Sequence, residues 1–200
     1  MFFKDYTEFE EAKLACDRCP LRKVYGRVVA SEGNKKNPAI VIVGEAPGAD
    51  EVQEGRPFVG KAGQVLRNGL RPLGFTKSNT LITNTIPCRP PDNQYPADDR
   101  LVFLCMAIWL WHELDLLRPK VVLLLGGKAL RGVLGLSAVT ENRGRWFGLH
   151  RDGWEAEVMA TYHPSYVMRL RYSPEGPAKI KEWMGDLEAV AAKAGLTPPK

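Results

Sequence analysis

The chain has few cysteines and no long apolar run. Four cysteines in 200 residues are too few to staple a disulfide scaffold, and a chain of this length can bury a core without one. The longest apolar stretch, residues 101–111, is much shorter than the roughly 20 residues that cross a bilayer. The N-terminus lacks the apolar segment of a signal peptide. We therefore expect a soluble, cytoplasmic protein made of one domain over residues 1–200, with a frayed tail at about 196–200.

Acidic side chains are absent from one long stretch. The chain has 28 basic and 23 acidic residues, and the resulting net charge of +5 alone decides little. Six basic residues and no acid occur over residues 55–91, whereas residues 92–115 are mainly acidic. A basic front with an acidic back suits a polyanionic partner. An ordinary solvated surface explains such charge runs equally well.

Short apolar runs alternate with helical patterns along the chain. Four nearly continuous aliphatic runs, typical of strands buried on both faces of a parallel sheet, occupy residues 39–43, 80–84, 120–125 and 157–162. Apolar residues at helical spacing predict helices over residues 7–15, 63–73, 98–117, 128–134 and 177–194. This order predicts a three-layer α/β/α sandwich with a central four-stranded, mostly parallel sheet.

Small and polar residues follow each predicted strand. The first strand ends at residues 44–48, the second at Asn84, the third at residues 126–128 and the fourth at His163. Ligands of such sheets bind beyond the carboxyl ends of the strands. The sequence therefore predicts a close-fitting polar pocket at these four ends.

The four cysteines form a pattern that suits a metal site. Cys16 and Cys19 make a Cys-x2-Cys pair, and Cys88 and Cys105 complete the set. Four thiolates hold either zinc or an iron–sulfur cluster, and the spacing does not choose between them. Alternatively, Cys105 is a small buried hydrophobe in an apolar helix.

Several motifs together resemble family 4 uracil-DNA glycosylases. They are residues 44–51 (GEAPGADE), 55–63 (GRPFVGKAG), 82–91 (ITNTIPCRPP), 143–145 (RGR) and 161–166 (TYHPSY). The resemblance implies a monofunctional enzyme that removes uracil from DNA and so starts base excision repair. It also implies a [4Fe-4S] cluster, with zinc as the alternative occupant, on Cys16, Cys19, Cys88 and Cys105.

The resemblance assigns roles that the chemistry of the side chains supports. Asn84 carries a donor and an acceptor that match O4 and N3 of uracil and reject cytosine. Phe58 can stack on the flipped base, and His163 can donate to O2 as the base departs as an anion. With the two glycines of the first motif, the expected substrate-binding set is Gly44, Gly48, Phe58, Asn84 and His163.

The sequence does not identify the group that activates or orients the attacking water. Related families place an aspartate where this chain has Ala46, which cannot activate water, and Glu45 is the nearest candidate. The expected catalytic set is therefore Glu45, Ala46, Asn84 and His163. Because Ala46 lacks a carboxylate, two alternatives remain: an iron–sulfur DNA-binding protein of the same fold without activity, and a glycosylase for another base such as hypoxanthine.

Contacts with DNA are predicted around the same strand ends. The resemblance places an intercalating loop after His163, where apolar residues and arginines alternate, and we assign the wedge to Arg169, Leu170 and Arg171. Ser165 would offer its backbone amide to a phosphate, and Lys61 and Arg89 would supply charge. The expected partner is uracil-containing DNA, single- or double-stranded, with uracil as product. We expect a monomer with no membrane contact.

Overall fold

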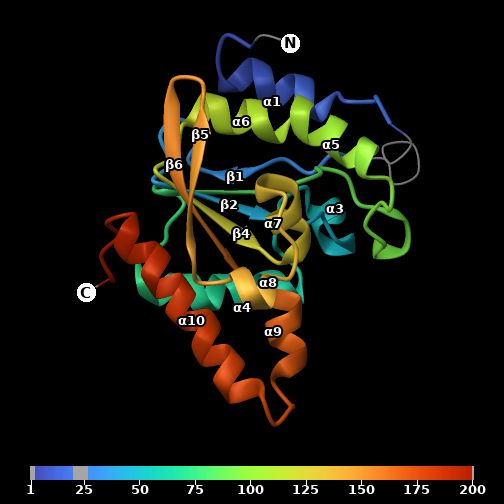
Figure 1. The fold of residues 1–200 in the computed structure, drawn as a ribbon. Coiled ribbons are helices and arrows are strands. Elements are labelled where there is room, and N and C mark those ends of the chain that lie inside the picture. Colours follow the sequence, from blue (N-terminus) through green and yellow to red (C-terminus); the bar gives the residue numbers. More distant parts are fainter. Residues whose placement is uncertain (1–2, 20–26, 200) are drawn as a thin grey trace.

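The chain folds around a mixed sheet (Figure 1). The computed structural model describes residues 3–19 and 27–199. Six strands of this part of the chain pair in the order β1-β3-β2-β4-β6-β5. They are β1 (Glu32–Gly33), β2 (Ile40–Gly44), β3 (Thr80–Asn84), β4 (Val121–Leu125), β5 (Trp146–Arg151) and β6 (Trp154–Thr161). Within the same residues, no helix is both long and apolar enough to span a membrane.

The centre of the sheet confirms the predicted architecture. Strands β2, β3, β4 and β6 are mutually parallel and correspond to the four aliphatic runs. β2, β3 and β4 are buried at every position, as expected for strands covered on both faces. The two antiparallel edge strands were not predicted, since β1 has two residues and β5 is largely half-exposed.

Helices cover both faces of the sheet (Figure 1). The upper layer of Figure 1 contains α1 (Tyr6–Leu14), α5 (Asp99–Ile108) and α6 (Leu110–Leu117), and α7 (Gly127–Leu134) packs into the same core. The lower layer contains α4 (Lys61–Leu70), α9 (Pro164–Leu170) and α10 (Gly176–Lys193). Shorter elements are α3 (Ala49–Glu54), α8 (Val139–Asn142), and the 3-10 turns η1 (Arg71–Leu73) and η2 (Pro91–Asn93). Alternate strand residues feed two cores, with Val41 and Val43 above the sheet and Ile40 and Ile42 below it.

Two sequence predictions need correction. The helix expected over 98–117 is two helices, because the backbone breaks at Trp109, whose buried ring packs 6.0 Å from that of Phe9. The loop expected after His163 is helix α9, which begins with Pro164 at a position that suits proline. The frayed tail expected at about 196–200 stays a prediction, and at its start the Leu196 amide donates to the Ala191 carbonyl.

A buried ion pair ties α1 to α6. The Lys13 ammonium lies 2.9 Å from a Glu113 carboxylate oxygen, and both side chains are almost fully buried. Tyr6 and Thr83 also donate to Glu113. Burial would raise the pKa of Glu113, but the Lys13 charge and hydrogen bonds from Ser31, Tyr6 and Lys13 lower it overall. This network fixes α1, which leads into Cys16, against the strand that ends at Asn84.

Candidate functional site

A cavity of about 380 Å³ opens at the carboxyl ends of the parallel strands. It gathers residues that are far apart in the sequence, since β2 and β3 end side by side with Gly44 opposite Asn84. Eight of the predicted site residues line it: Glu45, Ala46, Gly48, Phe58, Lys61, Asn84, His163 and Ser165. The volume and the mixture of apolar walls with a few polar groups suit a small planar ligand.

Asn84 presents a buried oxygen that lacks a partner. The residue ends β3 and is 8% exposed, and its Oδ1 is buried with no hydrogen-bond partner in the described part of the chain. Leaving such an acceptor unpaired costs roughly 1–3 kcal/mol. Gly44 allows this arrangement, because a Cβ atom there would lie 2.4 Å from Oδ1. The cavity therefore holds an acceptor ready for a donor on a ligand.

His163 is held as a neutral imidazole of defined tautomer. Its Nδ1 accepts from the Ser165 backbone amide at 3.2 Å, so Nδ1 carries no proton and Nε2 does in the neutral ring. Burial, and to a smaller extent the Arg169 charge, lowers the pKa of His163 to about 4. At neutral pH the side chain is therefore an uncharged Nε2–H donor.

Phe58 forms one wall of the cavity in an unusual backbone conformation. Its φ is +54°, which for a bulky residue costs roughly 1–2 kcal/mol, and its ring is 7% exposed. The ring lies 6.0 Å from the His163 ring and against Gly44, where a Cβ atom would approach Phe58 Cζ to 2.6 Å. Strain of this kind persists only where neighbouring contacts enforce it.

Glu51, which the sequence analysis did not single out, supplies some of those contacts. One carboxylate oxygen accepts from the amides of Val59 and Gly60 at 2.9 and 2.8 Å, and the other accepts from Gly48 at 3.0 Å. Glu51 thus binds the two glycine-rich loops of the cavity to each other. A detectable signal existed, since an acid three residues after Gly48 matches the spacing of a helix capping box.

Glu45 lies in the cavity wall beside a hydroxyl pair. Burial raises the pKa of its carboxyl group, partly opposed by the Lys128 charge. Thr85 Oγ1 donates to the Glu45 carbonyl oxygen at 2.6 Å and lies 2.7 Å from the hydroxyl of Tyr95. The backbone of Glu45 is therefore fixed, and Ala46 beside it offers only a methyl group.

The four cysteines gather above the sheet, and none forms a disulfide. Cys88 is 4% exposed, and the others are half-buried against the same core. Burial raises the pKa of the Cys105 thiol, and the nearby thiols of Cys88, Cys19 and Cys16 raise it further. Across residues 3–19 and 27–199, no three His, Cys, Asp or Glu side chains converge as ligands of one metal ion. The four thiols therefore lie near one another against the same core.

The predicted DNA contacts separate into two groups. Lys61 and Ser165 lie at the cavity, whereas Arg89 donates to Asn93 at its edge. The proposed wedge lies at the end of α9, with Leu170 half-buried between two exposed arginines, Arg169 and Arg171.

The basic run over residues 55–91 is not a continuous basic surface. Three of its six cations, Arg56, Arg67 and Lys77, form ion pairs with Glu32 on β1. The acidic stretch is also partly neutralised, because Asp99 pairs with Arg131 and Asp115 with Arg151. The expected basic front is therefore reduced in charge by acids and bases from elsewhere in the sequence.

The sequence is similar to those of known proteins. A family model described as the uracil DNA glycosylase superfamily matches residues 30–188. This chain belongs to that superfamily. A type-4 uracil-DNA glycosylase of Pyrobaculum aerophilum is 38% identical over 188 residues, which cover 92% of this chain and 91% of the relative. Type-4 enzymes of Thermotoga maritima (35% over 161 residues, 78% and 79%) and Archaeoglobus fulgidus (33% over 191 residues, 93% and 92%) are also similar.

These similarities confirm the predicted family and the α/β class. The family match over residues 30–188 includes the ends of the parallel strands and the residues that line the cavity, so the superfamily relationship covers the whole cavity. The roles of single residues, from Asn84 to the four cysteines, stay predictions at this point.

Proposed function

We propose that the protein is a uracil-DNA glycosylase that hydrolyses the N-glycosidic bond of a flipped-out deoxyuridine and leaves an abasic site. The observation that carries this proposal is the unpaired Oδ1 of Asn84, buried in a cavity of about 380 Å³ at the strand ends. Uracil offers an N3–H donor to that oxygen and an O4 acceptor to the amide nitrogen. The type-4 relatives, all named for this activity, support the same conclusion.

Base selection follows from the fixed side chains of the cavity. Cytosine presents an acceptor at N3, which would leave Asn84 Oδ1 without a donor and repel it. Sites built to hydrogen-bond a substrate reject an analogue that lacks the matching group strongly, because buried polar groups then stay unpaired. Phe58 supplies the apolar stacking surface for the ring.

His163 would stabilise the leaving base. As the glycosidic bond breaks, negative charge develops on O2 of uracil, and the Nε2–H of a neutral imidazole donates to it. The lowered pKa matters here, since a neutral donor holds its proton while it shares it with the anion. Water must then reach the sugar from its other face. Glu45 lines the cavity and is the carboxylate that we assign to that role, because Ala46 provides no acid or base.

The four cysteines would hold a [4Fe-4S] cluster. A set of four thiols suits iron–sulfur chemistry, and a four-iron cluster spaces its thiolates more widely than one zinc ion does. When bound, the cluster would supply a rigid link between the segment after α1, the Cys88 loop and α5. Cys88 is four residues from Asn84, so this link would stabilise the base-reading strand end.

Release of free uracil from a uracil-containing oligonucleotide tests the proposal directly. We expect product from single- or double-stranded uracil DNA, and an alkali-labile abasic site in the remaining strand. Replacement of Asn84 by aspartate keeps the size and removes the amide donor, so Asn84→Asp should lower the single-turnover rate by about 100-fold or more. Asn68→Asp makes the same chemical change on an exposed face of α4 and should leave the rate unchanged.

DNA binding without uracil release would instead favour the non-catalytic binding protein. Release of hypoxanthine in preference to uracil would favour the altered base choice. The cluster proposal is tested separately: purified protein should be brown and absorb near ~400 nm. A colourless protein with stoichiometric zinc would contradict it.

A further inference from the structure

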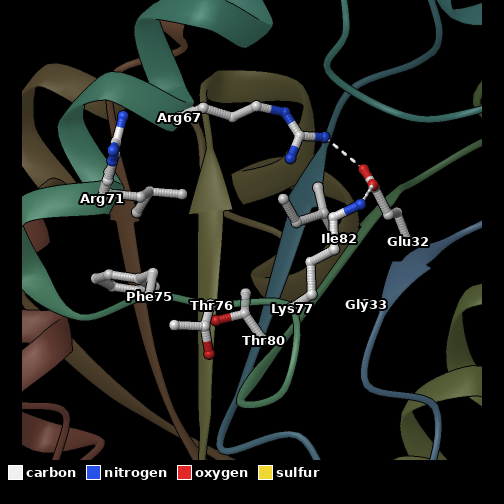
Figure 2. A pocket seen from close by; sticks show the side chains of 10 residues that line it. Glu32, Gly33, Arg67, Arg71, Phe75, Thr76, Lys77, Thr80 and Ile82 are labelled. Carbon is white, nitrogen blue, oxygen red and sulfur yellow. Dashed lines mark hydrogen bonds and ion pairs between the residues drawn. The ribbon is translucent and has the colours of Figure 1, made fainter.

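A second pocket borders the wall that carries Phe58. It lies at the β1–β3 edge of the sheet, and Figure 2 shows Arg67 of α4 and Lys77 reaching toward Glu32 on β1. Its volume is about 250 Å³, and its walls combine apolar residues, such as Phe75 and Ile82, with Arg67, Arg71 and Lys77. Among the cations of this pocket, Arg67 also donates hydrogen bonds from its guanidinium to backbone carbonyls of the Phe58 loop.

The Arg67 guanidinium joins three acceptors. Nε donates to the Phe58 carbonyl oxygen at 3.0 Å, and Nη2 donates to the Pro57 carbonyl oxygen at 3.0 Å. Nη2 also forms an ion pair with Glu32, as the dashed line in Figure 2 indicates. The Glu32 side chain is only 11% exposed, and bonds from Lys77 and Arg67 outweigh its burial and lower its pKa. Glu32 is therefore a fixed anion that orients the fork of Arg67.

The loop over residues 57–60 is bound through both its carbonyls and its amides. Arg67 binds the carbonyls of residues 57 and 58, while Glu51 binds the amides of residues 59 and 60. The Phe58 backbone also packs directly against Gly63, since a Cβ atom at Gly63 would lie 2.0 Å from the Phe58 carbonyl oxygen. These contacts enclose Phe58, a residue of the cavity wall whose φ is +54°. The neighbouring groups thus enforce a conformation that the side chain itself disfavours.

We propose that Arg67, oriented by Glu32, is a positioning residue that sets the Phe58 ring for stacking on the flipped base. The inference rests on the proposed glycosylase function and extends it to a residue outside the catalytic cavity. Arg67 touches neither the base nor the sugar in this scheme. It acts through the carbonyls of Pro57 and Phe58, which belong to the two peptide groups that flank Phe58, and so fixes the φ and ψ of that residue and thereby the direction of the ring.

Lys77 provides a matched control. It pairs with the same Glu32 carboxylate at 2.6 Å, but its side chain is 70% exposed, against 35% for Arg67. Arg67→Met and Lys77→Met each remove one cation from Glu32, and only the first removes the two bonds to the loop. We expect Arg67→Met to lower the single-turnover rate of uracil release at least about tenfold, because small misplacements in an active site cost that much. Lys77→Met should stay within about twofold of the parent.

A double-mutant cycle tests whether Arg67 acts through Phe58. Phe58→Leu removes the stacking ring, so Arg67→Met should have almost no further effect in that background. The affinity for free uracil, measured by product inhibition, should fall with the rate in Arg67→Met and stay unchanged in Lys77→Met. A merely structural role would instead lower thermal stability and leave the rate of the folded protein intact.

Arg67→Lys keeps the test informative if Arg67→Met does not fold. Lysine preserves the charge beside Glu32 but lacks a fork, so we expect a melting temperature near that of the parent and a rate still reduced about tenfold. Full activity of Arg67→Lys, equal effects of the Arg67 and Lys77 variants, or an undiminished Arg67→Met effect in Phe58→Leu would each overturn the inference. A parent protein that releases no uracil would refute the proposed function itself, which is a different outcome.

Discussion

The protonation of His163 offers the sharpest test of the chemistry proposed for the cavity. Its pKa is lowered to about 4, mainly by burial, whereas an unperturbed histidine titrates near 6.5. At pH 5.5 a group with a pKa of 4 is about 97% neutral, and an ordinary histidine is only about 10% neutral. If the neutral Nε2–H donor is required, the rate of uracil release should stay level from pH 7.5 to about 5.5. It should fall only as the pH approaches 4.

Single-turnover rates across this pH range give the profile without interference from product release. An acid limb with an apparent pKa near 6.5 would refute the assignment, because it would mean that the ring is solvated or unused. His163→Gln keeps a neutral donor and should remove the pH dependence near 4 while lowering the rate. Absorbance near ~400 nm during each assay separates loss of a cluster at low pH from protonation of the imidazole.

The same shift predicts a pH dependence of stability. Because the folded pKa lies below the unfolded one, protons bind first to the unfolded chain. The stability associated with neutral His163 is complete above pH 6.5 and is lost as the pH falls from 6.5 to 4. The shift from 6.5 to about 4 corresponds to about 3 kcal/mol at 1.36 kcal/mol per unit. The free energy of unfolding in urea should fall between pH 6.5 and pH 4 by this amount more in the parent than in His163→Gln. His112 and His150 are common to both proteins, so their titration cancels in the comparison.

Three further predictions concern groups around the cavity. Gly44→Ala should abolish uracil release in the same assay, because the added Cβ would lie 2.4 Å from Asn84 Oδ1. Glu113→Ala should cost about 3–5 kcal/mol in urea unfolding, because it leaves Lys13 buried without its anion, and Lys13→Met with Glu113→Leu should recover most of that loss. Arg143→Lys should cost about 1–2 kcal/mol in the same measurement with little effect on uracil release, since lysine cannot replace the paired guanidinium bonds to Asp186.

The central strands were predictable because their burial on both faces favours apolar residues at every position. A strand covered on both faces must be apolar throughout, as in residues 121–125, and few other elements share that pattern. The edge strand β1 lacks such an apolar pattern, since its two residues are half-exposed and depend on pairing with β3 for their conformation. Helix α9 was missed for a related reason: its start depends on Pro164 and on the His163 ring as an acceptor, which local apolar spacing does not reveal.

The polar strand ends of the site were equally predictable, and their supports were not. Asn84 and His163 follow apolar runs, so the topology of a parallel sheet brings them to one edge. Glu51 binds backbone amides of the Phe58 loop and Arg67 binds its carbonyls, and backbone donors and acceptors look the same at every residue of the sequence. The capping-box spacing marks Glu51 only as a helix cap, and its contacts with residues 59 and 60, like those of Arg67, become visible only when the loop conformation is known.

The acid-free stretch over residues 55–91 shows how a charge pattern changes meaning once the chain is folded. Glu32 precedes the stretch by more than twenty residues, yet β1 brings it against Arg56, Arg67 and Lys77. These cations are therefore partly neutralised, and one of them is used to hold a loop. We expect the attraction for DNA to come mainly from Lys61 at the cavity and from the exposed arginines at the end of α9. The slope of DNA affinity against salt concentration should then become shallower in Lys61→Met and hardly change in Lys77→Met. An equal change of slope in the two variants would contradict this conclusion and favour a continuous basic surface over residues 55–91.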